Sequence, residues 1–388
     1  MSELDLLVRG GLAALPDRME HLDIGVFDGR IVALEHNLEY RAAAILEASG
    51  LILLPGAIDP AVRVGDFASG SAALAAGGVT CLAELPGAAG FGPVFDRDDF
   101  IRKREMGLAL SRLDFALWGG ISARNLYELA PLRDCGVIGF QASLTPFGPG
   151  RPQGDLLPVT PTVLGQAMKR AARLKLPVGI EVYDPDPDIE LERLQVVLNL
   201  AGEAGCRLHL WGITVPEGIS LVEDARGREV DATVATTPDD LLLQTRRPGN
   251  GFGLGSAWRA GRIDLIASGG RPGALAAAEH GFPEIWTEAA LNPEATLSLA
   301  KTVARFTART AHRFGLDRRK GELAVGRDAD FSLLDVDEPR TLVGAGNPYA
   351  GREVWGRVVR TMQRGRTVFA NGGIVKVAKP EEACFIRP

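Results

Sequence analysis

Histidine and cysteine, two residue types that often hold catalytic metals, are scarce in this sequence. The 388 residues include five histidines and four cysteines. No HxH, HxxH or HExxH motif occurs, and no CxxC motif brings two thiols together. The sequence therefore excludes a histidine-rich binuclear metal centre. Cysteines so far apart are typical of reduced thiols, which predicts a cytoplasmic protein.

Long apolar runs and an excess of positive charge are also missing. No apolar stretch approaches the roughly 20 residues that span a bilayer, and the first residues contain no signal-peptide core. The formal net charge of −6 disfavours a general binder of nucleic acid or acidic membranes. With 46% hydrophobic and 24% charged residues, the composition is that of a soluble globular protein. We therefore expect neither a nucleic-acid partner nor a membrane partner.

Short β-strand patterns are concentrated at the two ends of the chain. Residues 23–27 and 30–34 flank Asp28-Gly29, and an Asp-Gly pair between apolar runs predicts a hairpin. Residues 331–334 and 354–363 predict further strands near the other end. A β-rich start cannot form the helical outer layer of a barrel and needs a partner sheet, which the strands at the other end can supply.

Strands and helices alternate between these ends. Seven strand patterns follow the short one at Ala57, and they are separated by helical patterns such as residues 162–174 and 189–204. About eight strands in this arrangement predict an α/β fold, a (β/α)₈ TIM barrel. The predicted organisation is a sandwich part at residues 1–54, a barrel at 55–318 and a second sandwich part at 319–388.

Three motifs resemble the cyclic amidohydrolases, a family that includes dihydroorotases, allantoinases and hydantoinases. They are PGAIDP at residues 55–60, AAGGVT at 75–80 and KGELAVGRDAD at 320–330. The resemblance covers nearly the whole chain and implies a barrel with a small β-sandwich. It also implies a hydrolase whose metal centre uses an HxH pair, a carboxylated lysine, two further histidines and a catalytic aspartate.

The residues at the family's metal and base positions are different in this chain. Each position is assigned from the motif beside it. The replaced positions are Ala61 and Arg63 for the HxH pair, Gln141 for the lysine, Glu181 and Gly212 for the later histidines, and Gly269 for the aspartate. An amide cannot be carboxylated, and glycine offers no side-chain ligand. We therefore predict no catalytic residue of the family type, no metal and no cofactor.

Other residues of the expected substrate pocket are also altered or relocated. Gly87 replaces the asparagine of the family's MPN turn, and Asp239-Asp240 replace a histidine pair. Asp66 lies in a shortened loop, and His209 lies three residues before the expected histidine position. These residues are candidates for a pocket at the barrel mouth. Arg63 and Glu181 have opposite charges, and we predict that they pair, directly or through Gln141, where the metals would lie.

The replacements lead to three hypotheses about function. The main expectation is a catalytically inactive, dihydroorotase-like protein with a structural or regulatory role, for example beside aspartate transcarbamoylase in pyrimidine metabolism. The first alternative is an active hydrolase of cyclic amide C–N bonds with Asp66, Glu181, Asp239 and Asp240 as candidate acids and bases. The second alternative is a small-molecule binding protein. Family resemblance also predicts a homo-oligomer.

Overall fold

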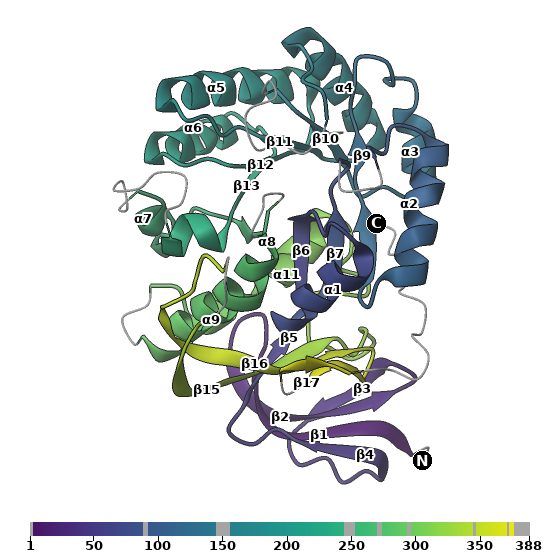
Figure 1. The fold of residues 1–388 in the computed structure, drawn as a ribbon, viewed down its shortest axis with the longest axis vertical. Helices are drawn as coiled ribbons and strands as arrows, with labels where there is room; N and C mark the ends of the chain where they lie inside the picture. Colours follow the sequence, from purple (N-terminus) through teal and green to yellow (C-terminus); the bar gives the residue numbers. More distant parts are fainter. Residues whose placement is uncertain are drawn as a thin grey trace.

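The computed structural model describes residues 3–87, 92–144, 156–243, 253–269, 274–292, 296–343, 347–370 and 372–375. A β-sandwich forms one end of the molecule, and a barrel with an outer layer of helices forms the other (Figure 1). No helix in these ranges has both the length and the apolar character needed to cross a bilayer.

The sandwich is built from one nine-stranded sheet that contains strands from both ends of the chain. Its order is β18-β17-β16-β15-β5-β1-β2-β3, and β4 pairs with β1. The strands are β1 (Leu4–Ala14), β2 (Met19–Phe27), β3 (Arg30–Glu35), β4 (Ala42–Glu47), β5 (Ile52–Pro55), β15 (Phe331–Thr341), β16 (Glu353–Gln363), β17 (Arg366–Ala370) and β18 (Gly373–Ile374). The two halves join where β15 pairs antiparallel with β5.

The predicted Asp28-Gly29 hairpin is present between β2 and β3. Both residues have positive φ, +49° for Asp28 and +70° for Gly29. Such values match the twist of the two strands, which is why an Asp-Gly pair favours this turn.

The barrel strands are parallel and mostly short. They are β6 (Ala57–Val62), β7 (Val79–Glu84), β8 (Asp114–Leu117), β9 (Gly119–Gly120), β10 (Phe140–Ala142), β11 (Val178–Glu181), β12 (Leu208–Trp211), β13 (Ala232–Thr236) and β14 (Leu265–Ile266). Trp118 alone separates β8 from β9, so we count these two segments as one of the eight barrel strands. A parallel bridge from Val62 to Gly269 closes the barrel. The predicted TIM barrel with a sandwich is therefore confirmed.

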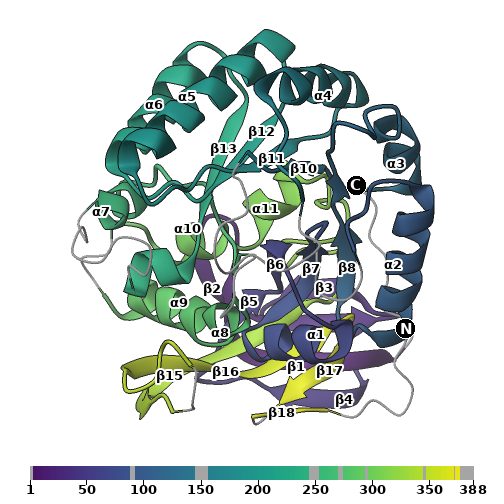
Figure 2. The ribbon, with the colours of Figure 1, turned by 45° about the horizontal axis from the view of Figure 1, so that its top comes forward.

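Helices cover the outside of the barrel (Figure 2). They are α1 (Phe67–Ala76), α2 (Arg97–Leu110), α3 (Leu129–Cys135), α4 (Pro161–Leu174), α5 (Pro187–Ala204), α6 (Pro216–Gly227), α7 (Gly253–Arg259), α8 (Ala274–Ala276), α9 (Phe282–Leu291), α10 (Leu299–Val303) and α11 (Ala308–Arg313), with the π-helical turns η1 (Asp239–Leu243) and η2 (Ala277–Gly281). The side chain of Asp186 caps the start of α5, and Gly205 ends it in the left-handed conformation.

Aromatic side chains fill the inside of the barrel below its mouth. Trp118 packs against Trp211 with ring centroids 6.1 Å apart and against Phe314 at 5.4 Å. A Cβ at Gly179 would lie 2.7 Å from the Trp211 ring, so the strand needs glycine there to leave room for it. The mouth therefore lies above a packed floor.

Candidate active site at the mouth of the barrel

The carboxyl ends of the barrel strands meet at one edge, where barrel enzymes place their active sites. All six replaced positions lie at these ends. They are Ala61, Arg63, Gln141, Glu181, Gly212 and Gly269. Strand register fixes part of their arrangement, because the Gly269 N–H donates to the Ala61 carbonyl over 3.1 Å and Glu181 pairs with Trp211.

Three of the six positions carry no polar side-chain atom. Ala61 is buried, and Gly212 and Gly269 have φ values of +80° and +89°. Glycine is favoured in this left-handed region, whereas other side chains are strained there. A Cβ at Gly269 would also lie 3.1 Å from Cγ2 of Thr237. The backbone at these two glycines is therefore poorly suited to a histidine or an aspartate.

Arg63 lies beside a buried ion pair that the sequence analysis missed. Glu84 ends β7, and its Oε1 lies 3.4 Å from Nζ of Lys103 on α2. Lys103 also donates to the Leu85 carbonyl over 2.9 Å, and the Val64 N–H donates to Glu84 over 3.0 Å. Burial raises the pKa of Glu84 and lowers that of Lys103, while the charge of Arg63 lowers both pKa values. The available signal was a glutamate at the end of a mostly apolar strand.

Asp59 and Ser268 form a second buried contact beside Gly269. Ser268 donates its hydroxyl to Oδ2 of Asp59 and its N–H to Oδ1 over 3.2 Å, and the Ala61 N–H approaches Oδ1 at 3.3 Å. Burial is the main cause that raises the pKa of Asp59 to about 6. The contact ties β6 to the segment after β14, which is where the barrel closes.

His209 lies inside the barrel and not at its mouth, which corrects its assignment to the pocket. Its ring is fully buried, stacks 6.4 Å from Trp118 and lies 5.1 Å from Phe314. Nδ1 lies 2.9 Å from the Thr233 hydroxyl, and burial lowers the histidine pKa to about 3. The side chain lies two residues before the end of β12 and packs among aromatic rings, so it belongs to the aromatic floor.

Asp66 has a structural contact that accounts for its carboxylate. It accepts hydrogen bonds from the N–H groups of Ala68 and Ser69 at 2.9 and 3.1 Å and thereby caps α1. The hydrogen bonds from Ser69 are the main cause that lowers the pKa of Asp66. A carboxylate with a lowered pKa is a weaker proton acceptor, so Asp66 is poorly suited to act as a base.

The two neighbouring aspartates after β13 have different partners. Asp239 accepts a hydrogen bond from the Tyr349 hydroxyl over 2.7 Å, and Asp240 accepts one from the Thr237 hydroxyl over 2.9 Å. Gly87 is buried in the segment that follows β7. These positions follow the carboxyl ends of β13 and β7, and their place in a common pocket stays a prediction.

Comparisons with known proteins identify the family of this chain. Residues 252–368 match the model of the amidohydrolase family. An allantoinase of Rubrobacter xylanophilus is 32% identical over 100% of this chain and 98% of its own length. An allantoinase of Solibacter usitatus is 34% identical over 94% of this chain and 93% of its own. The chain belongs to the cyclic amidohydrolases.

The fold of this cyclic amidohydrolase also matches solved structures. The L-hydantoinase of Arthrobacter aurescens superposes with a TM-score of 0.85 at 23% identity, covering 96% of this chain and 97% of that one. A D-hydantoinase superposes with a TM-score of 0.84 at 20% identity and covers 99% of this chain. At these identities the likeness supports the fold alone.

The similarity to whole enzymes corrects the main expectation of a catalytically inactive protein. Relatives that align with the full chain are named allantoinase, and another is named L-hydantoinase. These names favour the alternative, an active hydrolase of cyclic amide C–N bonds. The replaced residues had been interpreted as loss of chemistry, because the family's known ligands were the only standard of comparison.

The residues at the six positions do not fit the family's binuclear metal centre. Ala61, Gly212 and Gly269 have no donor atoms, and Arg63 carries a positive charge that repels a cation. Gln141 offers an amide in place of the bridging carboxylated lysine, and Glu181 supplies the only carboxylate of the set. Imidazole and carboxylate ligands are what such a centre requires. No catalytic step of this cyclic amidohydrolase is therefore assigned to that centre.

In the described part of the chain, one group of three carboxylates has the geometry of a metal site, and it lies elsewhere. Asp114, Asp328 and Asp330 are all buried and converge where β8 begins. Nζ of Lys320 lies among them, 2.9 Å from Asp328 and 2.5 Å from each of the other two. Arg364 adds a bidentate contact to Asp114. The lysine already supplies the cation, and the cluster joins the sandwich to the barrel.

Proposed function

We propose that this protein hydrolyses the ring C–N bond of a cyclic amide of the allantoin or hydantoin type, at the barrel mouth and without the family's binuclear centre. The observation that carries the proposal is the similarity to allantoinases over the whole chain. The charged residues at the mouth give it a chemical basis, because Arg63 and Glu181 occupy two of the family's ligand positions.

In this proposal Arg63 stabilises the oxygen of the ring carbonyl as negative charge develops on it. A fixed guanidinium in a site shielded from water is well suited to this task. Its surroundings support the assignment, since Arg63 lies close enough to Glu84 and Lys103 to influence both pKa values. The Glu84 carboxylate also offsets the cost of placing two positive charges near one another.

Glu181 acts as the general base. Its carboxylate takes a proton from water while the water oxygen bonds to the ring carbonyl carbon. The C–N bond then breaks, and Glu181 returns the proton to the leaving nitrogen. One water is consumed, and the product is a ring-opened acid. Glu181 is half-buried at the end of β11, and its direct pairing with Arg63 stays a prediction.

The test is an assay of purified protein against allantoin, hydantoin and dihydroorotate, with metal content measured by mass spectrometry on the same sample. We expect ring opening of allantoin or hydantoin, no stoichiometric metal, and turnover that survives treatment with a chelator. Turnover that depends on added zinc would contradict the metal-free site. Binding of these compounds without turnover would contradict the hydrolase and favour a small-molecule binding protein.

Quaternary structure and location are separate predictions. We propose that the chain forms a homo-oligomer and that it is a cytoplasmic protein. Light scattering of the purified protein tests the first prediction, and fractionation of the source cells tests the second.

A further inference from the structure

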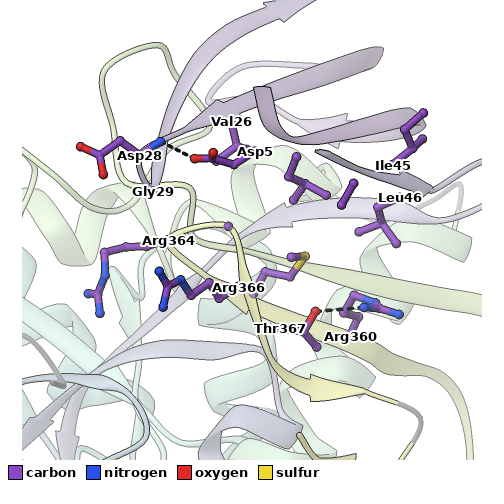
Figure 3. A pocket seen from close by; sticks show the side chains of 14 residues that line it. Asp5, Val26, Asp28, Gly29, Ile45, Leu46, Arg360, Arg364, Arg366 and Thr367 are labelled. Carbon is purple, nitrogen blue, oxygen red and sulfur yellow. Dashed lines mark hydrogen bonds between the residues drawn. The ribbon is translucent and has the colours of Figure 1, made fainter. Parts of the chain in front are cut away.

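A cavity of about 590 Å³ lies in the sandwich, away from the barrel mouth. It is bounded by residues of β1, β2, β4, β16 and β17 and by the turns at Asp28-Gly29 and Arg364-Gly365 (Figure 3). This volume is in the range of cavities that hold small molecules. Leu6, Val26 and Met362 belong both to the buried apolar core of the sandwich and to the lining of this cavity, so the cavity reaches that core.

Positive charge is concentrated on one side of the cavity. Arg360, Arg364 and Arg366 all line it, and all come from the β16–β17 hairpin. Figure 3 shows Arg364 and Arg366 projecting toward one end, while Arg360 lies at the other end with Thr367. The Arg360 guanidinium donates to the Thr367 hydroxyl over 2.9 Å, which holds it in place. The Arg360 guanidinium is therefore held in a defined orientation along the cavity wall.

The acidic residues that line the cavity are Asp5 and Asp28. The carboxylate of Asp5 accepts a hydrogen bond from the Asp28 N–H over 2.6 Å, which places it at the turn. Arg364, in contrast, forms a bidentate contact with Asp114 outside the cavity. Arg364 thus has a structural role, whereas Arg360 is paired with a neutral hydroxyl and retains its charge for another partner.

The opposite side of the cavity is apolar. Val26 comes from β2, and Ile45 and Leu46 come from β4, across the cavity from the β16–β17 hairpin. Ile45 is 51% exposed, so its apolar side chain is accessible to a ligand. Figure 3 shows Ile45 and Leu46 at the same end as Arg360. A guanidinium thus lies opposite an accessible apolar surface.

We propose that this cavity binds a small organic anion that carries an apolar group, with its carboxylate or phosphate on Arg360 and its apolar part against Ile45 and Leu46. A charged hydrogen bond from guanidinium to an oxyanion supplies orientation. Burial of the apolar part supplies affinity that a simple inorganic anion cannot obtain. The proposal is independent of the reaction proposed for the barrel mouth.

The test uses methyl NMR of methionine-labelled, full-length protein titrated with octanoate and, separately, with inorganic phosphate. The sequence has five methionines, and Met362 is the one that lines the cavity. Met106 and Met168, on α2 and α4, are internal references. We expect octanoate to shift the Met362 signal in a saturable manner and to leave both references unchanged. Met362→Leu identifies the signal.

Substitutions separate the two halves of the proposed ligand. Arg360→Gln should weaken octanoate binding about tenfold or more, because a charged hydrogen bond is lost. Ile45→Ser should weaken octanoate several-fold and leave phosphate unaffected. The matched control is Arg357→Gln on the same strand, whose arginine bonds to Asp335 over 3.2 Å and lies outside the cavity.

Three outcomes would overturn the proposal. The first is a Met362 signal that neither probe shifts in the unmodified protein, which requires no variant to fold. The second is octanoate binding that is equal in Arg360→Gln and the Arg357→Gln control. The third is phosphate binding as strong as octanoate binding and insensitive to Ile45→Ser, which would indicate a simple oxyanion site.

Discussion

Both ends of the barrel contain a buried lysine, but the two lysines have different surroundings. At the amino end, burial alone would lower the pKa of Lys320, but the carboxylates of Asp330, Asp114 and Asp328 raise it above its usual value. At the carboxyl end, Lys103 pairs with Glu84 at 3.4 Å, and burial lowers its pKa. Three close carboxylates outweigh the effect of burial on Lys320 and stabilise its charged form. The single carboxylate of Glu84, at a longer distance, does not outweigh the effect of burial on Lys103.

We propose that this difference separates a structural end of the barrel from a reactive one. Charges that are matched at the amino end hold the sandwich against the barrel. At the carboxyl end, groups with perturbed pKa values lie around the mouth, and such groups are typical of functional sites. The following predictions test this division, beginning with the largest effect.

Glu181→Gln should lower kcat for the cyclic amide by roughly 10²- to 10⁴-fold, because general-base catalysis contributes about this much. Its thermal stability should stay close to that of the unmodified protein. Steady-state kinetics and thermal unfolding provide both readouts. Glu192→Gln, an exposed position on α5, is the matched control. Equal activity in the two variants would remove Glu181 from the mechanism.

Lys320→Met should destabilise the protein by about 3–5 kcal/mol, because removal of one partner leaves buried carboxylates uncompensated. Denaturant unfolding measures the loss. Lys301→Met, at an exposed position of α10, should change little. If the two variants were equally stable, the cluster at the amino end would not be a structural joint.

Asp59→Asn should change how stability depends on pH. The pKa of Asp59 is about 6 in the folded protein and about 3.9 when unfolded. The folded state therefore binds more protons between these values, and the carboxyl group lowers stability as pH rises through this window. The total cost at neutral pH is about 3 kcal/mol.

The test is to measure the free energy of unfolding of Asp59→Asn and of the unmodified protein from pH 3.5 to 7.5. The stability difference between Asp59→Asn and the unmodified protein should shift in favour of the variant by about this amount as pH rises. A constant offset from the altered hydrogen bonds does not affect the slope. Parallel curves would show that Asp59 has no raised pKa.

Asp66→Ala should have the smallest effect, about 1 kcal/mol of stability, because it removes the cap of α1. Unlike Asp59, Asp66 has a lowered pKa, so its contribution is present above the unfolded value and lost as pH falls. Activity should be retained. A large loss of kcat would instead make Asp66 a base at the mouth.

Local sequence signals predicted the fold because they act over short distances. Asp28-Gly29 determines its own hairpin turn, and the apolar run of β7 is buried on both faces as a parallel barrel strand must be. The motif positions at the mouth followed from the ends of these strands. The position of His209, three residues before the expected histidine, indicates a different depth on the strand. The aromatic rings that surround it could not be derived from spacing.

The contacts around the site required the three-dimensional structure. Asp59 and Ser268 are separated by 209 residues in the sequence, and the partners Glu84 and Lys103 belong to a strand and a helix whose relative rotation no motif specifies. A buried acidic residue implies that it has a partner, but the sequence does not identify which residue that partner is. The ion cluster around Lys320 also joins residues from distant segments, so its composition could not be derived from spacing.

The pairing of β5 with β15 has a consequence for synthesis of the chain. Phe331 pairs with Pro55. The edge of β5 therefore stays unpaired until β15, which leaves the ribosome much later, has been synthesised. At 5–20 residues per second, this delay is roughly a quarter of a minute to a minute. An unpaired strand edge is a template for aggregation during that time. Chains that stall before β15 should therefore depend on chaperones to remain soluble.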